Sequence, residues 1–327
     1  MLPGPWSVSG DGENGKQSAA GSAVGEAKPF EPLSEHRTQF SPEDNDALLQ
    51  EASRQLSSGV FDHSNQAAIE RLVDGLGDTR GLVRFGFAER LAAVGRPALP
   101  LLRHALRADA NVAVRRAAAK IFTLINDAGS ADVLLEAMIH DPDPVVQGSA
   151  TGALAEIGAP AVPLLLGVLE RSAEPALTKG LAAWALASIG ARGAALLKPA
   201  MESERVDVRA AVVGALGDQI QNAADREALK LLHQALEDPA EDVQAEAVTA
   251  FGKLNSPEFV PLLAANLKAG RPDEVRRNAA LALMKCRNEA GLPPLLAALQ
   301  EEGDGPLNVV LNLAITQLKR SLQTLQD

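Results

Sequence analysis

Hydrophobic residues recur along most of the chain in the pattern of amphipathic helices arranged in pairs. A phrase in which valine or leucine precedes a long polar side chain and several alanines returns about every 32 residues. Within each unit, apolar residues stand at positions i, i+3, i+4 and i+7 of two successive segments, which predicts two helices. The apolar residues that anchor the eight units are Val83, Val114, Val146, Leu177, Val208, Val243, Val275 and Val310.

A helical hairpin with two apolar faces cannot bury both of them alone, but stacked hairpins bury each other's faces. The pattern therefore predicts an all-α protein, an α-α superhelix of about eight helical hairpins. The segment Asp141-Pro142-Asp143-Pro144 shows the turn inside one hairpin. Asp141 is expected to cap the following helix, and Pro142 is expected to end the preceding one. Gly158 is expected to end the second helix in a conformation with positive φ.

The chain divides into three predicted segments. Residues 1–40 are rich in Gly, Ser, Ala and Glu and lack apolar periodicity, which predicts a disordered tail. Residues 41–64 are predicted to form a leading helical segment, with Ser41 as N-cap and Pro42 at the first helical position. Residues 65–327 contain the repeats. Neither a signal-peptide pattern nor a membrane-spanning apolar run occurs, so a cytoplasmic protein is expected.

Composition limits the classes of partner. The net charge of −11 and pI near 5.1 disfavour nonspecific nucleic-acid binding. Cys286 is the single cysteine, which excludes an intrachain disulfide and fits a reducing compartment. Two interpretations of Cys286 stay open: a small buried side chain, or a thiol whose pKa is lowered by the neighbouring Lys285 and Arg287.

A long side chain that can donate hydrogen bonds follows the anchor in seven of the eight repeats. In a stacked array these side chains would lie above one another, near acidic residues of the turns between helices. This placement predicts a structural ladder of charge-assisted hydrogen bonds, and the alternative is that some donors face an anionic ligand. The ladder residues are Arg84, Arg115, Gln147, Lys179, Arg209, Gln244 and Arg276, and the eighth repeat has Leu311.

Three further residues are candidates for binding a partner. Arg116 and Arg277 each directly follow a ladder arginine, about 100° further round the helix, so they cannot belong to the same ladder. Trp184 is the only tryptophan of the repeats. It either fills the core or lies exposed on the concave surface as an anchor for a partner or a flat chromophore.

Three phrases resemble the short HEAT-like repeats of the phycobilin lyase family, over roughly residues 65–320. They are Val114-Arg115-Arg116-Ala117-Ala118-Ala119, Gly180-Leu181-Ala182-Ala183-Trp184-Ala185-Leu186 and Val275-Arg276-Arg277-Asn278-Ala279-Ala280-Leu281-Ala282-Leu283. The resemblance implies that the solenoid is HEAT-like. Members attach or remove linear tetrapyrroles at phycobiliprotein cysteines, or assist phycobilisome assembly and breakdown, in cyanobacteria and related phototrophs.

The di-iron chemistry of another HEAT-repeat class, the deoxyhypusine hydroxylases, is not expected. Those enzymes use repeated His-Glu pairs, whereas the five histidines here are scattered and no His-Glu dipeptide occurs. Phosphate-binding glycine loops and serine-nucleophile motifs are also absent from the sequence. Neither a metal nor a cofactor is therefore expected, and no catalytic residue can be named.

Two functions remain open at the level of sequence. The first is a protein-binding scaffold or chaperone resembling phycobilisome assembly and turnover factors. The alternative is a phycobilin lyase or lyase subunit, which would be the enzyme class. The chain lacks tyrosine and the aromatic residues that adjoin the tryptophan in the lyases, which favours the scaffold. Protein partners are expected in both cases, phycobiliprotein subunits among them, and a linear tetrapyrrole is the expected small ligand of the lyase.

Overall fold

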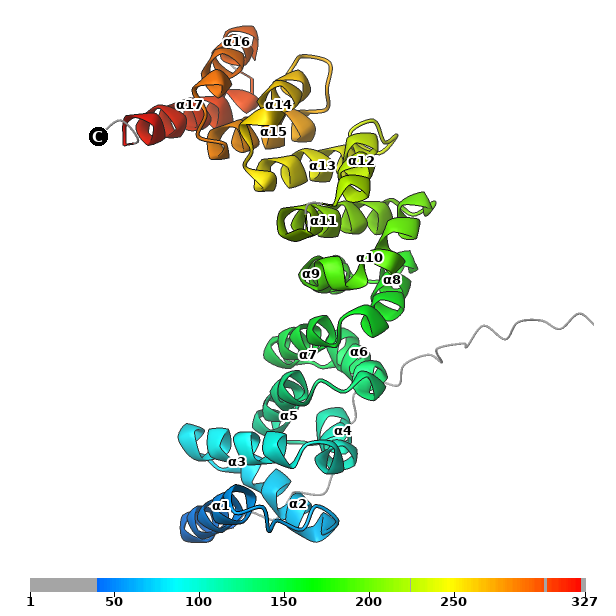
Figure 1. Ribbon diagram of the computed structural model, residues 1–327, viewed down its shortest axis with the longest axis vertical. Coiled ribbons are helices and arrows are strands. Elements are labelled where there is room, and N and C mark those ends of the chain that lie inside the picture. Colours follow the sequence, from blue (N-terminus) through cyan, green and yellow to red (C-terminus); the bar gives the residue numbers. More distant parts are fainter. Residues whose placement is uncertain (1–39, 224, 303–304, 325–327) are drawn as a thin grey trace, which may run out of the picture.

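The structure, a computed structural model, describes residues 40–223, 225–302 and 305–324. The predicted tail lies almost wholly in residues 1–39, outside the described residues. Every regular element in the described part is helical, and the helices form an arch in which both ends curve to the same side (Figure 1). The prediction of an α-α superhelix of about eight hairpins is confirmed.

One leading helix, α1 (Pro42–Ser57), precedes eight pairs of helices. The first helices of the pairs are α2 (Gln66–Asp74), α4 (Leu99–Ala108), α6 (Ala131–His140), α8 (Val162–Glu170), α10 (Ala194–Leu197), α12 (Arg226–Ala235), α14 (Val260–Asn266) and α16 (Leu292–Glu302). The second helices are α3 (Gly81–Val94), α5 (Val112–Ile125), α7 (Pro144–Ile157), α9 (Ala176–Ile189), α11 (Val206–Ala223), α13 (Glu241–Leu254), α15 (Asp273–Lys285) and α17 (Leu307–Gln323).

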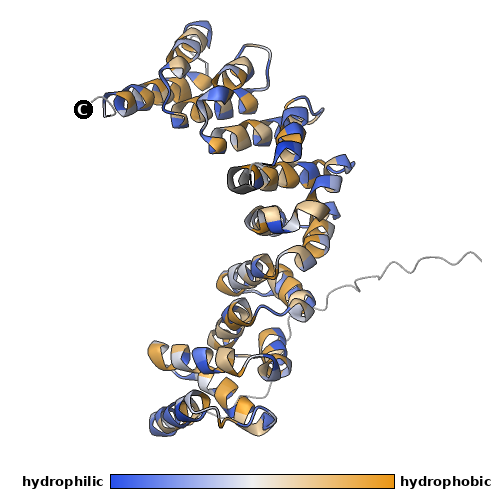
Figure 2. Ribbon diagram, viewed as in Figure 1, coloured by the Kyte–Doolittle hydropathy of each residue, from blue (hydrophilic) through white to orange (hydrophobic). Residues whose placement is uncertain are grey.

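The second helices stack directly on one another and line the concave side of the arch, while the first helices form its outer layer (Figure 1). Hydrophobic residues occur in the helices of both layers along the whole array (Figure 2). They form one continuous core, in which Phe87, Phe122 and Phe251 are among the largest fully buried side chains. Each interface between repeats therefore contributes to stability, as in other repeat arrays.

The turn between α6 and α7 differs from its prediction in one respect. Asp143, not Asp141, is the N-cap, because its carboxylate accepts hydrogen bonds from the backbone N–H groups of Val145 and Val146. Asp141 accepts instead from the backbone N–H of Asp143, which closes the turn. Gly158 ends α7 at φ 79°, a conformation with positive φ that favours glycine.

The anchor of the fourth repeat was predicted one residue too early. Leu177 is 65% exposed, and Thr178 takes the buried position that valine occupies in neighbouring repeats. The reason is that Ala176 begins α9 and thereby places its third residue, Thr178, toward the core. Threonine can fill this site because its size and shape are close to those of valine.

Among the described residues, one continuous helical stretch, Ala176–Glu202, is by length and composition apolar enough to cross a membrane. In the solenoid it comprises α9, two 3-10 turns and α10, and the chain changes direction at Gly190, where φ is 49°. Lys179, Arg192 and Lys198 lie within it and form ion pairs with other repeats. It provides the second helix of the fourth pair and the first helix of the fifth pair.

The close stacking of α11 on α13 depends on Gly217. A Cβ at this position would lie 2.8 Å from the Cβ and 3.2 Å from the Cα of Ala250, whose backbone cannot move away cheaply. We expect Gly217→Ala to be less stable than Gly148→Ala by about 1–3 kcal/mol, the usual cost of overpacking. Gly148 is the matched control, because it is also inside a helix and its added Cβ would meet no atom. Urea unfolding of both variants measures the difference, and equal stabilities would contradict it.

Candidate functional site

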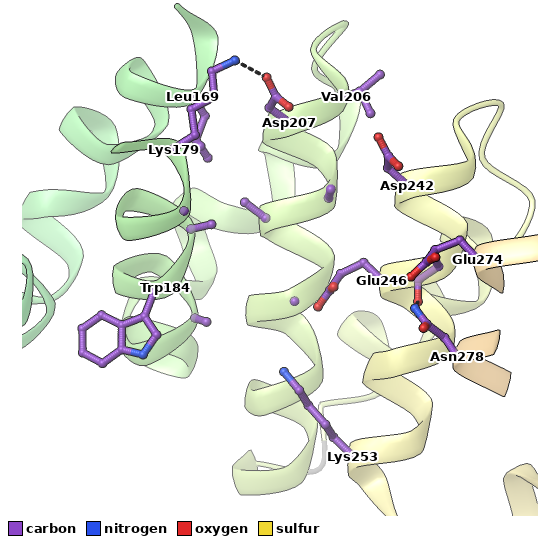
Figure 3. A pocket seen from close by; sticks show the side chains of 17 residues that line it. Leu169, Lys179, Trp184, Val206, Asp207, Asp242, Glu246, Lys253, Glu274 and Asn278 are labelled. Carbon is purple, nitrogen blue, oxygen red and sulfur yellow. Dashed lines mark hydrogen bonds and ion pairs between the residues drawn. The ribbon is translucent and has the colours of Figure 1, made fainter. Parts of the chain in front are cut away.

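A groove of about 540 Å³ lies on the concave side between α9, α11, α13 and α15 (Figure 3). Its size falls within the range of small-molecule sites, roughly 300–1,000 Å³. Glycine and alanine residues form its floor, so that the helix backbones lie near its surface. These residues are Gly180, Ala183, Ala187, Ala210, Gly214 and Ala245.

Trp184 stands at the α9 edge of the groove, and its indole ring points away from α11 (Figure 3). The side chain is 56% exposed, so the structure excludes the interpretation that it fills the core. An exposed tryptophan offers a large rigid apolar surface and one N–H donor, which suits it to bind a flat ligand or a protein surface.

Charged side chains line the groove from four helices, α9, α11, α13 and α15. Lys179 on α9 and Lys253 on α13 are the two cations that line it. The Lys179 ammonium lies 2.6 Å from Oδ2 of Asp207 on α11. The four carboxylates that line the groove belong to Asp207, Asp242, Glu246 and Glu274.

Gly214 allows the carboxylate of Glu246 to reach the middle of the groove. A Cβ on Gly214 would lie 2.9 Å from Oε1 of Glu246, so this carboxylate rests on the bare backbone of α11. Across the groove, the Asn278 side-chain amide donates to the carbonyl oxygen of Ala245 at 3.2 Å and holds α15 against α13. The groove thus combines an aromatic edge, cations, carboxylates and an apolar floor.

The predicted ladder residues lie at the interfaces between repeats. Arg115 donates to the carbonyl oxygen of Asp109 in its own repeat at 2.9 Å and to Oδ2 of Asp141 in the next repeat at 2.8 Å. Arg209 repeats this arrangement with the carbonyl oxygen of Ser203 and the carboxylate of Asp238. Each of these arginines therefore ties two successive repeats together with charge-assisted hydrogen bonds.

The other ladder residues form one or both of these two kinds of hydrogen bond. Arg84, Gln147 and Gln244 each donate to a carbonyl oxygen in the turn before their own helix. Arg276 donates to the carbonyl oxygen of Leu267 and to Glu302 of the next repeat. Leu311 is fully buried. Among the ladder residues, Lys179 is the one that also lines the groove.

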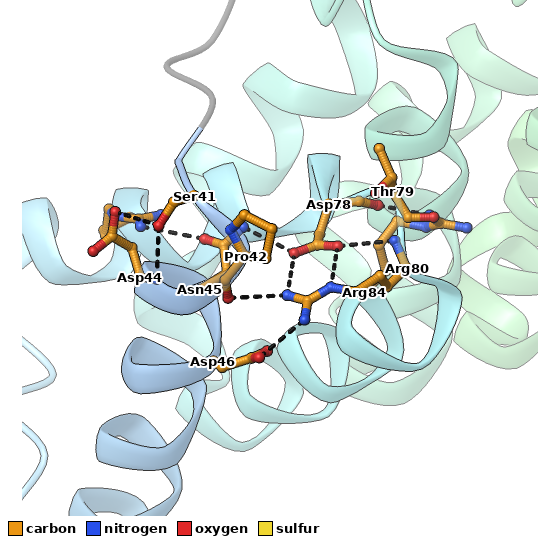
Figure 4. Close-up of polar contacts among 10 residues, drawn as sticks. Ser41, Pro42, Asp44, Asn45, Asp46, Asp78, Thr79, Arg80 and Arg84 are labelled. Atoms are coloured by element: carbon orange, nitrogen blue, oxygen red, sulfur yellow. Dashed lines mark hydrogen bonds and ion pairs between the residues drawn. The ribbon is translucent and has the colours of Figure 1, made fainter.

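A polar contact of the same kind joins α1 to the first repeat (Figure 4). The side-chain amide of the buried Asn45 donates to Oδ2 of Asp78 at 3.0 Å, as a ladder residue of α1 would. Arg80 also donates to Asp78, and this hydrogen bond holds the pKa of that carboxyl well below its ordinary value. Arg80 reaches Asp46 of α1 as well, at 2.9 Å. The leading helix thus packs like the second helix of an incomplete repeat and caps the array.

The structure does not bring the three binding candidates together. Arg116 lies two repeats before Trp184 and donates to Oδ1 of Asp143 at 2.9 Å. This hydrogen bond lowers the pKa of Asp143 from 3.8 to about 2. Arg277 is paired with Glu274, which lines the groove, while Trp184 lines the groove directly. Arg116 therefore joins repeats, in parallel with the ladder, while keeping an exposed face.

Asp242, Glu246 and Lys253 line the groove without having been predicted. Glu246 and Lys253 are seven residues apart on α13, which places them on one face of the helix two turns apart. This spacing could have identified, from the sequence alone, one charged face of α13. What the sequence could not supply is the proximity of α9 and α13, which are separated by a whole repeat.

The single cysteine, Cys286, is buried, and burial raises the pKa of its thiol. This supports its interpretation as a small apolar side chain. In the part of the chain that the structure describes, no three His, Cys, Asp or Glu side chains are placed to hold a metal ion.

The stacked pairs and the concave groove define an α-solenoid with a groove on its inner face. A family model described as HEAT repeats matches residues 99–187, 193–284 and 229–319. The chain is 37% identical over 267 residues to bilin biosynthesis protein MpeU of Synechococcus sp. strain WH8020, covering 82% of this chain and 90% of that protein. The chain belongs to the HEAT-like repeat proteins of the phycobilin lyase family.

Two further similarities extend the comparison. The chain is 32% identical over 157 residues to the uncharacterized phycocyanin operon protein Z of Pseudanabaena tenuis strain PCC 7409, covering 46% of this chain and 77% of that protein. The crystal structure of the karyopherin Kap121p bound to Pho4p matches with a TM-score of 0.55 at 16% identity. That match covers 89% of this chain and 39% of Kap121p, and it concerns the fold alone.

Proposed function

We propose that this protein binds a linear tetrapyrrole in the concave groove and acts in the cytoplasm as a phycobilin lyase or lyase subunit. The observation that carries the proposal is the composition of the groove, which joins an exposed tryptophan to two lysines and four carboxylates above a floor of small residues. The names of the two relatives, which refer to bilin biosynthesis and to a phycocyanin operon, support the same ligand class.

Each part of a bilin has a counterpart among these side chains. The propionates are anions and pair with Lys179 and Lys253. The pyrrole N–H groups are donors and suit the carboxylates of Glu246 and Asp242. The flat rings pack on the alanine floor, and a ring that extends to the α9 edge of the groove packs against Trp184. Because the groove carries more carboxylates than lysines, it also favours the protonated, cationic form of the tetrapyrrole.

The bilin would be held without a covalent bond to this protein, since its only cysteine is buried. Attachment to an acceptor is the addition of the acceptor's thiol across an exocyclic double bond of the bilin. A carbon–sulfur bond forms, and the thiol proton ends on the adjacent ring carbon, so no oxidant or reductant is consumed. Removal is the reverse elimination.

A scaffold or chaperone without bilin is the second interpretation. The exposed apolar side chains elsewhere on the concave side support contact with a protein in either case. The two functions differ in whether the groove takes up a bilin, so bilin binding is the observation that separates them.

Absorption spectroscopy of the purified protein with phycocyanobilin tests the proposal. We expect a red-shifted and narrowed visible band that saturates at tens of micromolar, and Glu246→Gln is expected to shift this band back toward shorter wavelengths. Transfer to an apo-phycobiliprotein should follow. Absence of any spectral change at these concentrations would leave the scaffold interpretation.

A further inference from the structure

Exposed apolar side chains continue from the groove toward the N-terminal end of the concave face. They belong to Leu82 and Phe85 of α3, Val145 of α7 and Leu177 of α9, and each is more than half exposed. We call these four residues the apolar row. Leu177 precedes Trp184 by seven residues, or two helical turns, so the row lies on the face that carries the tryptophan.

The repeat fold itself does not require these side chains. Leu82, Val145 and Leu177 are each the second residue of their helix, and Asp207, Asp242 and Glu274 hold the same position in α11, α13 and α15. The position is thus apolar in the N-terminal repeats and acidic beside the groove. Single exposed apolar residues are ordinary on protein surfaces, but large apolar side chains at the equivalent position in three of the first four repeats mark a contact surface.

Two cations of α5 lie beside the apolar row. Arg116 and Lys120 are spaced three and seven residues after Ala113, the residue of α5 that is equivalent to Leu82 and Val145. Lys120 is exposed and forms no ion pair with any residue in the described ranges. Arg116 is paired with Asp143, so Lys120 supplies the net positive charge that α5 offers beside the apolar row. A partner surface with apolar side chains and a carboxylate is complementary to this part of the concave face.

The backbone of α7 is accessible next to the row. A Cβ added to Gly148 or Gly152 would meet no atom within 4 Å, although glycine weakens a helix by about 1 kcal/mol. These two glycines are one helical turn apart and follow Val145 on the same face. A helix of a partner can therefore approach α7 more closely than larger side chains would allow.

We propose that the apolar row docks the protein that receives the bilin, through a helix whose apolar face carries a carboxylate opposite Lys120. The proposal rests on the proposed function, because the acceptor's cysteine must reach the groove edge at Trp184 while the acceptor is docked. The row begins on α9, the helix that also forms this edge, so docking and delivery occur on adjoining surfaces.

Direct binding of the purified full-length protein to apo-phycocyanin α and β subunits, in the absence of bilin, tests the docking surface. We expect Leu82→Glu and Val145→Glu each to weaken binding at least tenfold. Lys120→Glu is expected to weaken it at low salt and less at high salt. Leu296→Glu is the matched control, because Leu296 is an exposed leucine of the outer layer on α16. Circular dichroism melts confirm that the variants fold.

Bilin binding separates this proposal from the proposed function. Val145→Glu is expected to keep the spectral change with phycocyanobilin and to lose transfer to the subunits. If bilin does not bind but the subunits bind through the row, the proposed function fails and the docking surface stands. The docking proposal is overturned if neither subunit binds the wild type, or if the row variants bind as tightly as the wild type. It is equally overturned if gel filtration shows a wild-type dimer that Val145→Glu converts to a monomer.

Discussion

Replacing Asp141 with alanine is expected to destabilise the protein by about 3–5 kcal/mol, the usual cost of breaking a buried ion pair by removing one of its members. Asp141 and Arg115 form an ion pair in which the two side chains are 2% and 4% exposed. Without the carboxylate, the guanidinium of Arg115 stays buried between two repeats and loses both of its hydrogen bonds to Asp141, while its hydrogen bond to the carbonyl oxygen of Asp109 remains. The free energy of unfolding from urea titration measures the loss.

Asp207→Ala is the matched control for this prediction. Asp207 also pairs with a ladder residue of the preceding repeat, but its side chain is 43% exposed, and water can replace the lost partner of Lys179. We expect this variant to lose less than about 1 kcal/mol, as surface ion pairs do. Similar losses in the two variants would show that the buried pair does not hold the α5–α7 interface as described.

Replacing Trp184 with alanine is expected to weaken bilin binding about 10- to 100-fold, because stacking on an aromatic side chain contributes roughly 1–3 kcal/mol per ring. The exposed indole supports little of the core, so the stability of the protein should hardly change. Titration of the variant with phycocyanobilin, followed at the visible band, measures the affinity.

Trp184→Phe keeps an aromatic ring at the same edge and is expected to retain most of the affinity. Arg116→Ala is a second comparison, because Arg116 pairs with Asp143 two repeats away from Trp184. That variant is expected to bind bilin as the wild type does. An unchanged affinity in Trp184→Ala would remove the tryptophan from the site.

The architecture was predictable because the same local sequence pattern recurs in every repeat. Eight similar phrases determine the helical pairs, and single errors such as the choice of Leu177 over Thr178 do not change the fold. The error itself has a local cause. Leucine is the more apolar of the two residues, but one residue of shift at the start of α9 decides which side chain faces the core.

The candidate site was only partly predictable. Trp184 could be chosen from the sequence because it is the only tryptophan of the repeats. Its exposure could not be predicted, because it depends on how α9 stacks between α7 and α11. Glu246 and Lys253 look like ordinary surface charges in sequence. They become parts of a groove because Gly214 and Gly180 keep the neighbouring helices bare of side chains there. The ladder was easier to predict from the sequence, because each donor residue and the turn before it recur at nearly constant spacing.

Quenching of Trp184 fluorescence by phycocyanobilin tests the central claim most directly. The chain has two tryptophans, Trp6 and Trp184, so Trp6→Phe leaves Trp184 as the single indole emitter. A bilin bound in the groove absorbs in the near ultraviolet, where indole emits, and lies beside the ring. We predict saturable quenching with one bilin per chain, over the same concentrations at which the visible band shifts. A shifted visible band without quenching of Trp184 would place the bilin elsewhere and contradict the account.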